Sequence, residues 1–245
     1  SAFFLRAENG RYYADTVPTL NSVLAQIRQN VNRAEIARKL KSVASGIAGQ
    51  SGPFDVLYDI CRPQGIPDKG DRPALAVISI DAGELQPMDY FTSAGAQARV
   101  QQNRVLLLVP KTVRIVAGDA ETSLLDGLPG PQAKHLQHVT DLARQVIAYT
   151  KLDANPEQYG IQRKNLQDPD YVGRRSERNL ALQATVVGLY TTVLSPMGSD
   201  IRQRELRAAD DSAGLVGQIL DALRSDGKLL APGEHGYRAT DFQSM

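Results

Sequence analysis

Apolar residues recur at two different spacings along the chain, and the change of spacing divides it into regions. Over residues 17–31 and again over residues 36–47 they fall three or four positions apart, which is typical of amphipathic helices. The stretches 54–60, 74–80 and 104–110 are short, and the last two are apolar almost without interruption. Runs of this kind predict strands that are covered on both faces, as in a parallel sheet.

The start of the chain predicts a hairpin followed by two helices. Short apolar and aromatic runs flank Asn9-Gly10, the typical signal of a two-residue β-hairpin. We expect Thr16 to be the N-cap of the first helix. Asn32 and Glu35 form a capping-box pattern, which predicts where the second helix begins. Residues 1–52 are therefore expected to form the first structural unit.

Residues 53–119 are expected to form a small, largely parallel α/β layer. The segment between the second and third strand candidates, residues 90–102, predicts a crossover helix. Such a connection makes these two strands parallel neighbours with a right-handed crossover. The segment 61–73 has a proline or glycine every few residues and predicts a loop.

Residues 120–245 carry mainly helical patterns, with long helices expected at 133–152 and 176–194. The end of this segment predicts a helix followed by a hairpin with its turn at 233–236. A helix followed by a hairpin is also the C-terminal part of a winged-helix module. The expected fold class is therefore mixed α/β, with an α/β layer followed by a helical region and a winged-helix-like end. The hairpin at the start would then be the remnant of a second such module. The alternative is two unrelated surface hairpins.

Charge, cysteine content and the length of the apolar runs indicate which partners and which cellular compartment to expect. The net charge of +1 gives no whole-chain argument for nucleic acid or membrane as a partner. The single cysteine, Cys61, excludes an internal disulfide framework and fits a reducing cytosol. The longest apolar runs are too short to cross a bilayer. We therefore expect a cytoplasmic protein without a membrane partner.

Motifs for nucleotide and metal chemistry are missing from the sequence. There is no P-loop and no dinucleotide-binding glycine pattern. His135 and His138 lie three positions apart, but no third ligand follows them, which favours a solvated helix face. Cys61 follows a strand candidate without a recognisable base, which favours an inert core residue. No catalytic, cofactor-binding or metal-binding residue is therefore assigned.

Four carboxylates border the expected strands: Asp55, Asp59, Asp81 and Glu84. Metal-dependent nucleases place carboxylates in such positions. A nuclease core also places a Glu-x-Lys motif on a following strand, and the strand candidates here have none. We expect these carboxylates to cap turns and helices, and a metal-dependent hydrolase is the third functional hypothesis.

Two groups of arginines give the strongest indication in the sequence of a binding partner. Arginines clustered on one surface can bind phosphate backbones. Acidic residues interleave with them, so a surface of ion pairs explains the same pattern. The candidate nucleic-acid-binding residues are Arg174, Arg175, Arg178, Arg202, Arg204 and Arg207.

The segment "GRYYADTVPTLNSVL" resembles an aromatic-rich segment of large bacterial P-loop ATPases defined by the domain of unknown function 499. The matching residues are Tyr12, Asp15, Thr16, Pro18, Leu20 and Asn21. The order of later elements, up to "LARQVIAYTKL", is also similar, whereas residues 110–132 depart from that family's pattern. The resemblance implies a parent protein that binds ATP, encoded beside DNA methyltransferases in phage-defence islands.

The chain begins at Ser1 without an initiating methionine, and we expect it to be a piece of a longer polypeptide. The leading hypothesis is a non-catalytic region that couples an upstream ATPase core to DNA or to a partner such as a DNA methyltransferase. No cofactor is expected in this region, because the ATP site would lie upstream. The alternative hypothesis is a winged-helix-type DNA-binding module.

Overall fold

The structure is a computed structural model of the chain. It describes the backbone of residues 4–8, 11–15, 19–48, 52–116, 130–198, 200–206 and 214–226, with side chains from residue 19 onward. Strands β1 (Phe4–Glu8) and β2 (Arg11–Asp15) pair antiparallel with Glu8 opposite Arg11, which confirms the predicted hairpin. The second predicted hairpin and the turn at 233–236 lie outside the described residues, so the winged-helix hypothesis stays a prediction.

A five-stranded mixed sheet forms the base of the molecule, in the order β3-β4-β6-β8-β9. The parallel strands β3 (Asp55–Ile60), β4 (Ala74–Ile78) and β6 (Val105–Pro110) confirm the predicted α/β layer. Strands β8 (Tyr190–Met197) and β9 (Asp200–Glu205) extend it as an antiparallel hairpin beside β6. A separate two-stranded parallel sheet joins β5 (Glu84–Leu85) to β7 (Arg114–Ile115).

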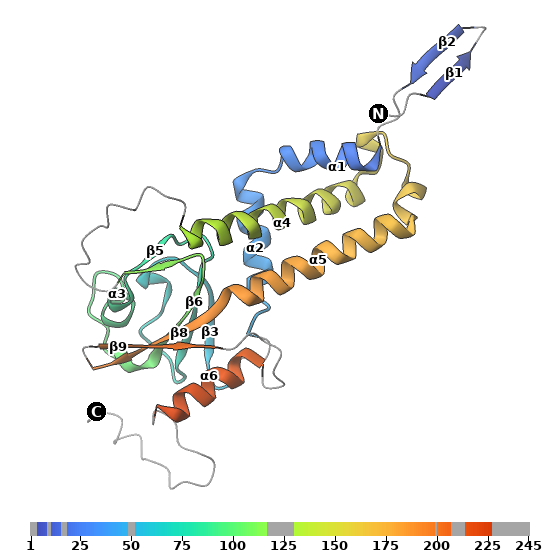
Figure 1. Cartoon of the computed structure of the whole chain (residues 1–245). Helices are drawn as coiled ribbons and strands as arrows, with labels where there is room; N and C mark the ends of the chain where they lie inside the picture. Colours follow the sequence, from blue (N-terminus) through green and yellow to red (C-terminus); the bar gives the residue numbers. More distant parts are fainter. Residues whose placement is uncertain are drawn as a thin grey trace.

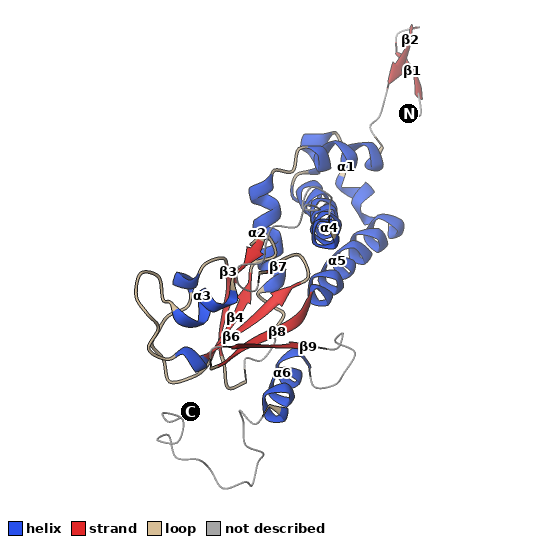
Figure 2. Ribbon diagram, turned by 60° about the vertical axis from the view of Figure 1, so that its left-hand side comes forward, coloured by secondary structure: helices blue, strands red, loops and turns tan. Residues whose placement is uncertain are grey.

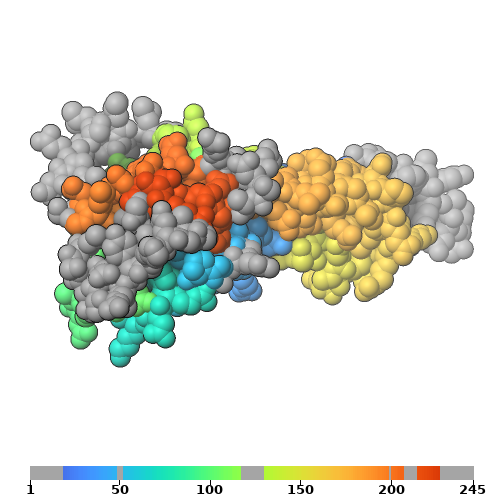
Figure 3. Space-filling model, turned by 90° about the horizontal axis from the view of Figure 1, so that it is seen from below, coloured from blue at the N-terminus to red at the C-terminus, as the bar shows by residue number. Residues whose placement is uncertain are grey.

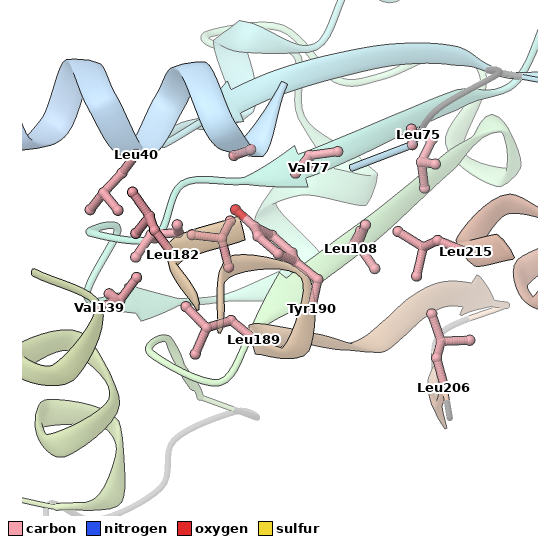
Figure 4. Close-up of a cluster of buried hydrophobic side chains, with 14 of the residues drawn as sticks. Leu40, Leu75, Val77, Leu108, Val139, Leu182, Leu189, Tyr190, Leu206 and Leu215 are labelled. Atoms are coloured by element: carbon pink, nitrogen blue, oxygen red, sulfur yellow. The ribbon is translucent and has the colours of Figure 1, made fainter. Parts of the chain in front are cut away.

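Both faces of the central strands are buried. Alternate residues of β4 and β6 point to opposite faces, because successive side chains of a strand alternate. Leu75 and Leu108 pack with the helices α2 (Arg33–Ala44), α4 (Pro131–Ala154), α5 (Pro169–Leu189) and α6 (Gly214–Ser225), as Figure 4 shows for part of this cluster. Ile78 and Leu107 pack on the other face with α3 (Pro87–Thr92) and the loops around it.

A helical arm extends away from the sheet (Figures 1 and 2). It consists of α1 (Leu20–Gln29), α4, the short helices η3 (Pro156–Tyr159) and η4 (Arg163–Gln167), and α5. A separate apolar cluster holds the arm together: Val23, Ile27, Ala148, Leu152, Ile161 and Tyr171. Figure 3 shows α6 on the base and the arm projecting to one side. Among the described helices, none is long and apolar enough to span a bilayer.

Two helix starts test the capping predictions. The capping box at α2 is confirmed, because the Glu35 amide donates to Asn32 Oδ1 at 2.9 Å and the Asn32 amide donates to Glu35 Oε2 at 3.1 Å. The N-cap predicted at Thr16 is wrong, since α1 begins at Leu20. Thr19 caps it by accepting from the Ser22 amide at 3.2 Å.

The predicted helix over 176–194 is wrong in its last residues, because α5 ends at Leu189 and the chain continues as β8. The residues Thr191, Thr192 and Val193 are β-branched and favour a strand. Val193 pairs with Leu108 of β6, so a tertiary contact far along the chain selects the strand. The predicted crossover helix over 90–102 is wrong over most of its length, since α3 begins at Pro87 and ends at Thr92.

Arg99 holds together the loops on the α3 side of the sheet. Its side chain is 1 % exposed, and its nearest carboxylate is Asp68, at 3.6 Å between Nη1 and Oδ1. Its guanidinium also donates to five backbone carbonyl oxygens, those of Pro63, Ile66, Pro67, Tyr90 and Ser93. Burial lowers the pKa of Arg99, and the negative charge of Asp68 opposes that shift. The two loops that connect β3 to β4 and β4 to β6 are therefore tied together by one side chain.

We expect Arg99→Ala to lower the free energy of unfolding by about 3–5 kcal/mol, because it strands buried carbonyl groups. Arg99→Lys restores only part of the loss, since an ammonium cannot reproduce the planar five-donor fork. Urea unfolding followed by circular dichroism measures both effects. The exposed Arg28 provides a control, and Arg28→Ala should change stability by less than about 0.5 kcal/mol. A loss below 1 kcal/mol for Arg99→Ala would contradict this role.

Candidate functional site

The candidate site is a cavity of about 310 Å³ at the carboxyl ends of β3 and β4. Ligands of open α/β sheets commonly bind at this edge. One wall is helix α2, which contributes Arg38 and Lys41. The opposite wall is formed by the ends of the strands and by Tyr190, whose ring lies in the core shown in Figure 4. The cavity therefore has charged groups of both signs around an apolar floor.

Two carboxylates meet at a buried hydroxyl in this cavity. Ser79 is 4 % exposed, and its Oγ lies 2.7 Å from both Asp59 Oδ1 and Asp81 Oδ1. A hydroxyl has one proton, so it donates to only one of the two carboxylates at a time. Lys41 Nζ lies 3.0 Å from Asp59 Oδ2 and balances part of the negative charge.

Asp59 reaches this position through an unusual backbone conformation. Its φ is 61°, which makes it the one non-glycine residue with positive φ in the described part of the chain. Such a conformation costs about 1–3 kcal/mol. The pairing register with β4 shifts between Leu57 and Ile60, so Asp59 lies in the irregular part of β3. Strained residues of this kind are concentrated at functional sites.

Cys61 also lines this site, so the prediction that it lies in the core is wrong. It is exposed, because it follows the last residue of an edge strand, where the chain leaves the sheet. The ligand atoms of Asp59, Cys61 and Asp81 all lie within 4.8 Å of one another, a spacing that allows one cation to bind all three. Carboxylates favour hard cations such as Mg²⁺ and Mn²⁺, and a thiolate favours softer ones.

Two tyrosines, one from each face of the sheet, donate hydrogen bonds to the backbone at the strand ends of the site. Tyr190 donates to the carbonyl oxygen of Ile78 at 2.9 Å, and Tyr90 donates to that of Cys61 at 2.8 Å. Burial raises the pKa of Tyr90 to about 12, with smaller contributions from Cys61 and Asp89. Burial, Asp59 and Asp81 raise the pKa of Tyr190. Both phenols therefore stay neutral donors near neutral pH.

The other predicted candidates lie elsewhere. Asp55 lies near Arg72, at 3.8 Å, at the opposite end of β3, and Glu84 pairs with Arg114 in the small sheet. His135 and His138 are exposed on α4, as expected. Ser79 and Lys41 were not predicted as site residues from the sequence. A serine and an aspartate directly after an apolar strand could have indicated Ser79, but only helix packing brings Lys41 to the site.

The five candidate arginines that the structure describes do not form one surface. Arg174, Arg175 and Arg178 lie on α5 in the arm, whereas Arg202 and Arg204 lie on β9 and Arg207 is outside the described residues. Arg174 lies 15 positions before Leu189, the last residue of α5, where the chain enters the sheet. This separation corresponds to a rise of about 22 Å along the helix. Arg175 is held by Asp153 at 2.7 Å. The first group therefore belongs to the arm, whereas Arg202 and Arg204 belong to the base.

Arg202 and Arg204 both bind Asp226, which lies at the end of α6. The side chain of Asp226 is 2 % exposed. Arg202 Nη1 lies 2.7 Å from Asp226 Oδ1, and Arg204 contacts the same oxygen. Burial alone would raise the pKa of Asp226, but the hydrogen bonds and charges of Arg204 and Arg202 outweigh it and lower the pKa below its ordinary value. These two arginines therefore fix α6 to the sheet.

The chain was compared with known proteins in three ways. No protein-family model matches it, no curated protein matches it, and no solved structure matches it. The resemblance to the family of domain of unknown function 499 therefore stays a prediction.

We expect Asp226→Asn to lower the free energy of unfolding by about 1–3 kcal/mol at pH 7, because it removes the charge that both arginines bind. The loss is no larger because both arginines are partly exposed to solvent, which weakens their ion pairs. A carboxyl whose folded-state pKa is lowered stabilises the fold above its unfolded pKa and loses that effect as pH falls. The difference between wild type and Asp226→Asn should therefore shrink below about pH 4. Urea unfolding at pH 7 and at pH 3 measures it, and an equal difference at both values would refute this role.

Proposed function

We propose that the chain is a non-catalytic region of a larger ATP-binding protein, which couples an ATPase core to DNA or to a partner protein in phage defence. We place this role in the cytoplasm, where the thiol of Cys61 stays reduced. The family resemblance of the first 110 residues is one support. The structural observation that carries the proposal is the direct passage of α5 into β8, which joins the arm to the sheet without a loop (Figure 1).

This junction is suited to transmitting motion. Leu182, Val186 and Leu189 of α5 pack in the same cluster as Tyr190 and Val193 of β8. Close-packed interiors resist deformation, so a displacement of the arm moves the strand rather than bending a linker. The α4 helix begins on the sheet side and packs along α5, which gives the arm a second support.

DNA is the partner class that the charge of the helical region favours. Residues 19–48 and 130–189 contain 13 Lys and Arg against 7 Asp and Glu, an excess of six positive charges in a chain whose net charge is +1. Basic surfaces attract the phosphate backbone at long range. Arg174 and Arg178 belong to this region, whereas Arg202 and Arg204 serve the fold.

The coupling role predicts a separation of activities. The purified chain should hydrolyse no ATP. In the longer protein, a Gly-Ser-Gly insertion after Leu189 should leave basal ATP hydrolysis intact and abolish its stimulation by DNA, because the arm is no longer rigidly joined to β8. The same insertion after Gly160, at the tip of the arm, is the control and should keep the stimulation. Hydrolysis by the chain alone, or normal stimulation after the Leu189 insertion, would refute the proposal.

A metal-dependent hydrolase is a second candidate, because Asp59, Asp81 and Cys61 converge in the cavity. A divalent cation held by the two carboxylates would polarise a phosphoester, and Lys41 would bind its phosphate oxygens. We expect Mn²⁺ binding, measured by calorimetry, to weaken at least tenfold in Asp59→Asn and in Asp81→Asn. Glu84→Gln, which removes a carboxylate outside the cavity, is the matched control. Equal binding by all three variants would exclude this candidate.

A further inference from the structure

A second cavity, of about 230 Å³, lies at the amino ends of the parallel strands. The first residues of β3, β4 and β6 line it, namely Asp55, Ala74 and Val105. It therefore lies at the opposite edge of the sheet from the cavity at Asp59, and the two cavities share no lining residue. Sites for drug-sized ligands measure about 300–1,000 Å³. A cavity of this smaller volume is suited to a single small ion or group.

Positive charge exceeds negative charge around this second cavity. Four cationic side chains and two carboxylates line it: Lys69, Arg72, Arg99, Arg104, Asp55 and Asp68. Asp68 is neutralised by Arg99, and its Oδ2 accepts a hydrogen bond from the Val100 amide at 2.8 Å. Asp55 Oδ1 lies 3.8 Å from Arg72 Nε. Neither Lys69 nor Arg104 forms an ion pair with a described residue, so two positive charges in the lining are uncompensated there.

Hydrogen-bond donors accompany these charges. Arg104 Nη1 donates to the carbonyl oxygen of Gly70 and to Gln101 Oε1, which leaves Nη2 and Nε of Arg104 without an acceptor among the described residues. The backbone amides of the loop 69–72 likewise meet no acceptor in the described part of the chain. This loop lies close to Asp55, since a Cβ placed on Gly70 would be 3.6 Å from Asp55 Oδ2. The cavity therefore presents N–H groups from two segments beside one carboxylate that is 48 % exposed.

We infer that this cavity binds one inorganic phosphate ion. Hydrogen phosphate carries two negative charges, which match the uncompensated positive charges of Lys69 and Arg104. Ammonium, guanidinium and backbone N–H groups bind phosphate oxygens through charge-assisted hydrogen bonds. The site depends neither on the proposed coupling role nor on the cavity at Asp59, because it is built from other residues.

Asp55 makes the site selective for free phosphate. Hydrogen phosphate keeps one proton, which the Asp55 carboxylate can accept as a hydrogen bond. Sulfate has the same tetrahedral shape and charge but no proton, so the carboxylate only repels it. The second pKa of a phosphate monoester is about 6, so at about pH 7.5 its dianion has no proton either. Phosphate should therefore bind more tightly than both of these anions.

Calorimetric titration of the full chain with inorganic phosphate, at low ionic strength, tests the site. Lys69→Gln should weaken phosphate binding at least about fivefold, because it removes one of the two uncompensated charges. Lys69 is exposed, so the circular dichroism spectrum should stay that of the wild type. Adding Arg104→Gln should abolish binding. Lys164→Gln makes the same change at an exposed lysine of the arm, and this matched control should bind phosphate as the wild type does.

A comparison of anions tests the role of Asp55. The wild type should bind phosphate at least about tenfold more tightly than sulfate or ribose 5-phosphate, because like charges that face each other repel. Asp55→Asn should reduce this preference, since a neutral amide no longer repels the two anions without a proton. No binding of phosphate by the wild type, or equal binding by Lys69→Gln and Lys164→Gln, would overturn the inference. Equal or tighter binding of sulfate or ribose 5-phosphate would also overturn it, as would an unchanged preference in Asp55→Asn.

Discussion

The two-sided burial of the central strands is the constraint on which the rest of the structure depends. All six residues of β6 are buried, and so are four of the five residues of β4. Such strands need a covering layer on each face, because exposed apolar surface would be costly in water. One face is covered by four helices, α2, α4, α5 and α6. On the other face, α3 is the one α-helix of the described residues that packs on the strands, so loops complete that layer.

The helical layer and the loop layer both bury apolar strand residues, but they satisfy their backbone hydrogen bonds in different ways. Helices satisfy their own backbone hydrogen bonds and bury side chains, whereas buried loops leave carbonyl groups that need donors. Arg99 supplies these donors on the loop side, which explains why a cationic residue lies inside an apolar layer. On the helical side, α4 and α5 extend well beyond the sheet and become the arm (Figure 2). The helices α4 and α5 therefore both cover the sheet and form the arm.

The candidate site follows from the same arrangement. The parallel strands β3 and β4 end at one edge, which brings Asp59 close to Ser79 and Asp81 although about 20 residues separate them. Asp59 was identified from the sequence as a strand-end carboxylate, and so was Asp81. Their convergence could not be predicted, because it depends on the left-handed backbone at Asp59 and on a register shift. Lys41 joins them only because α2 packs over the strand ends.

The sequence by itself determined the local structure. Apolar runs identified β3, β4 and β6, the Asn32 and Glu35 pair identified the start of α2, and Asn9-Gly10 identified the hairpin. These signals are local, since each depends on residues a few positions apart. Only the tertiary structure decided that residues 190–197 form a strand, that Arg202 and Arg204 bind Asp226, and that two carboxylates share Ser79. Each of these outcomes is fixed by contacts between segments distant in the chain, whose free energy outweighs local preference and leaves no periodic signal in the sequence.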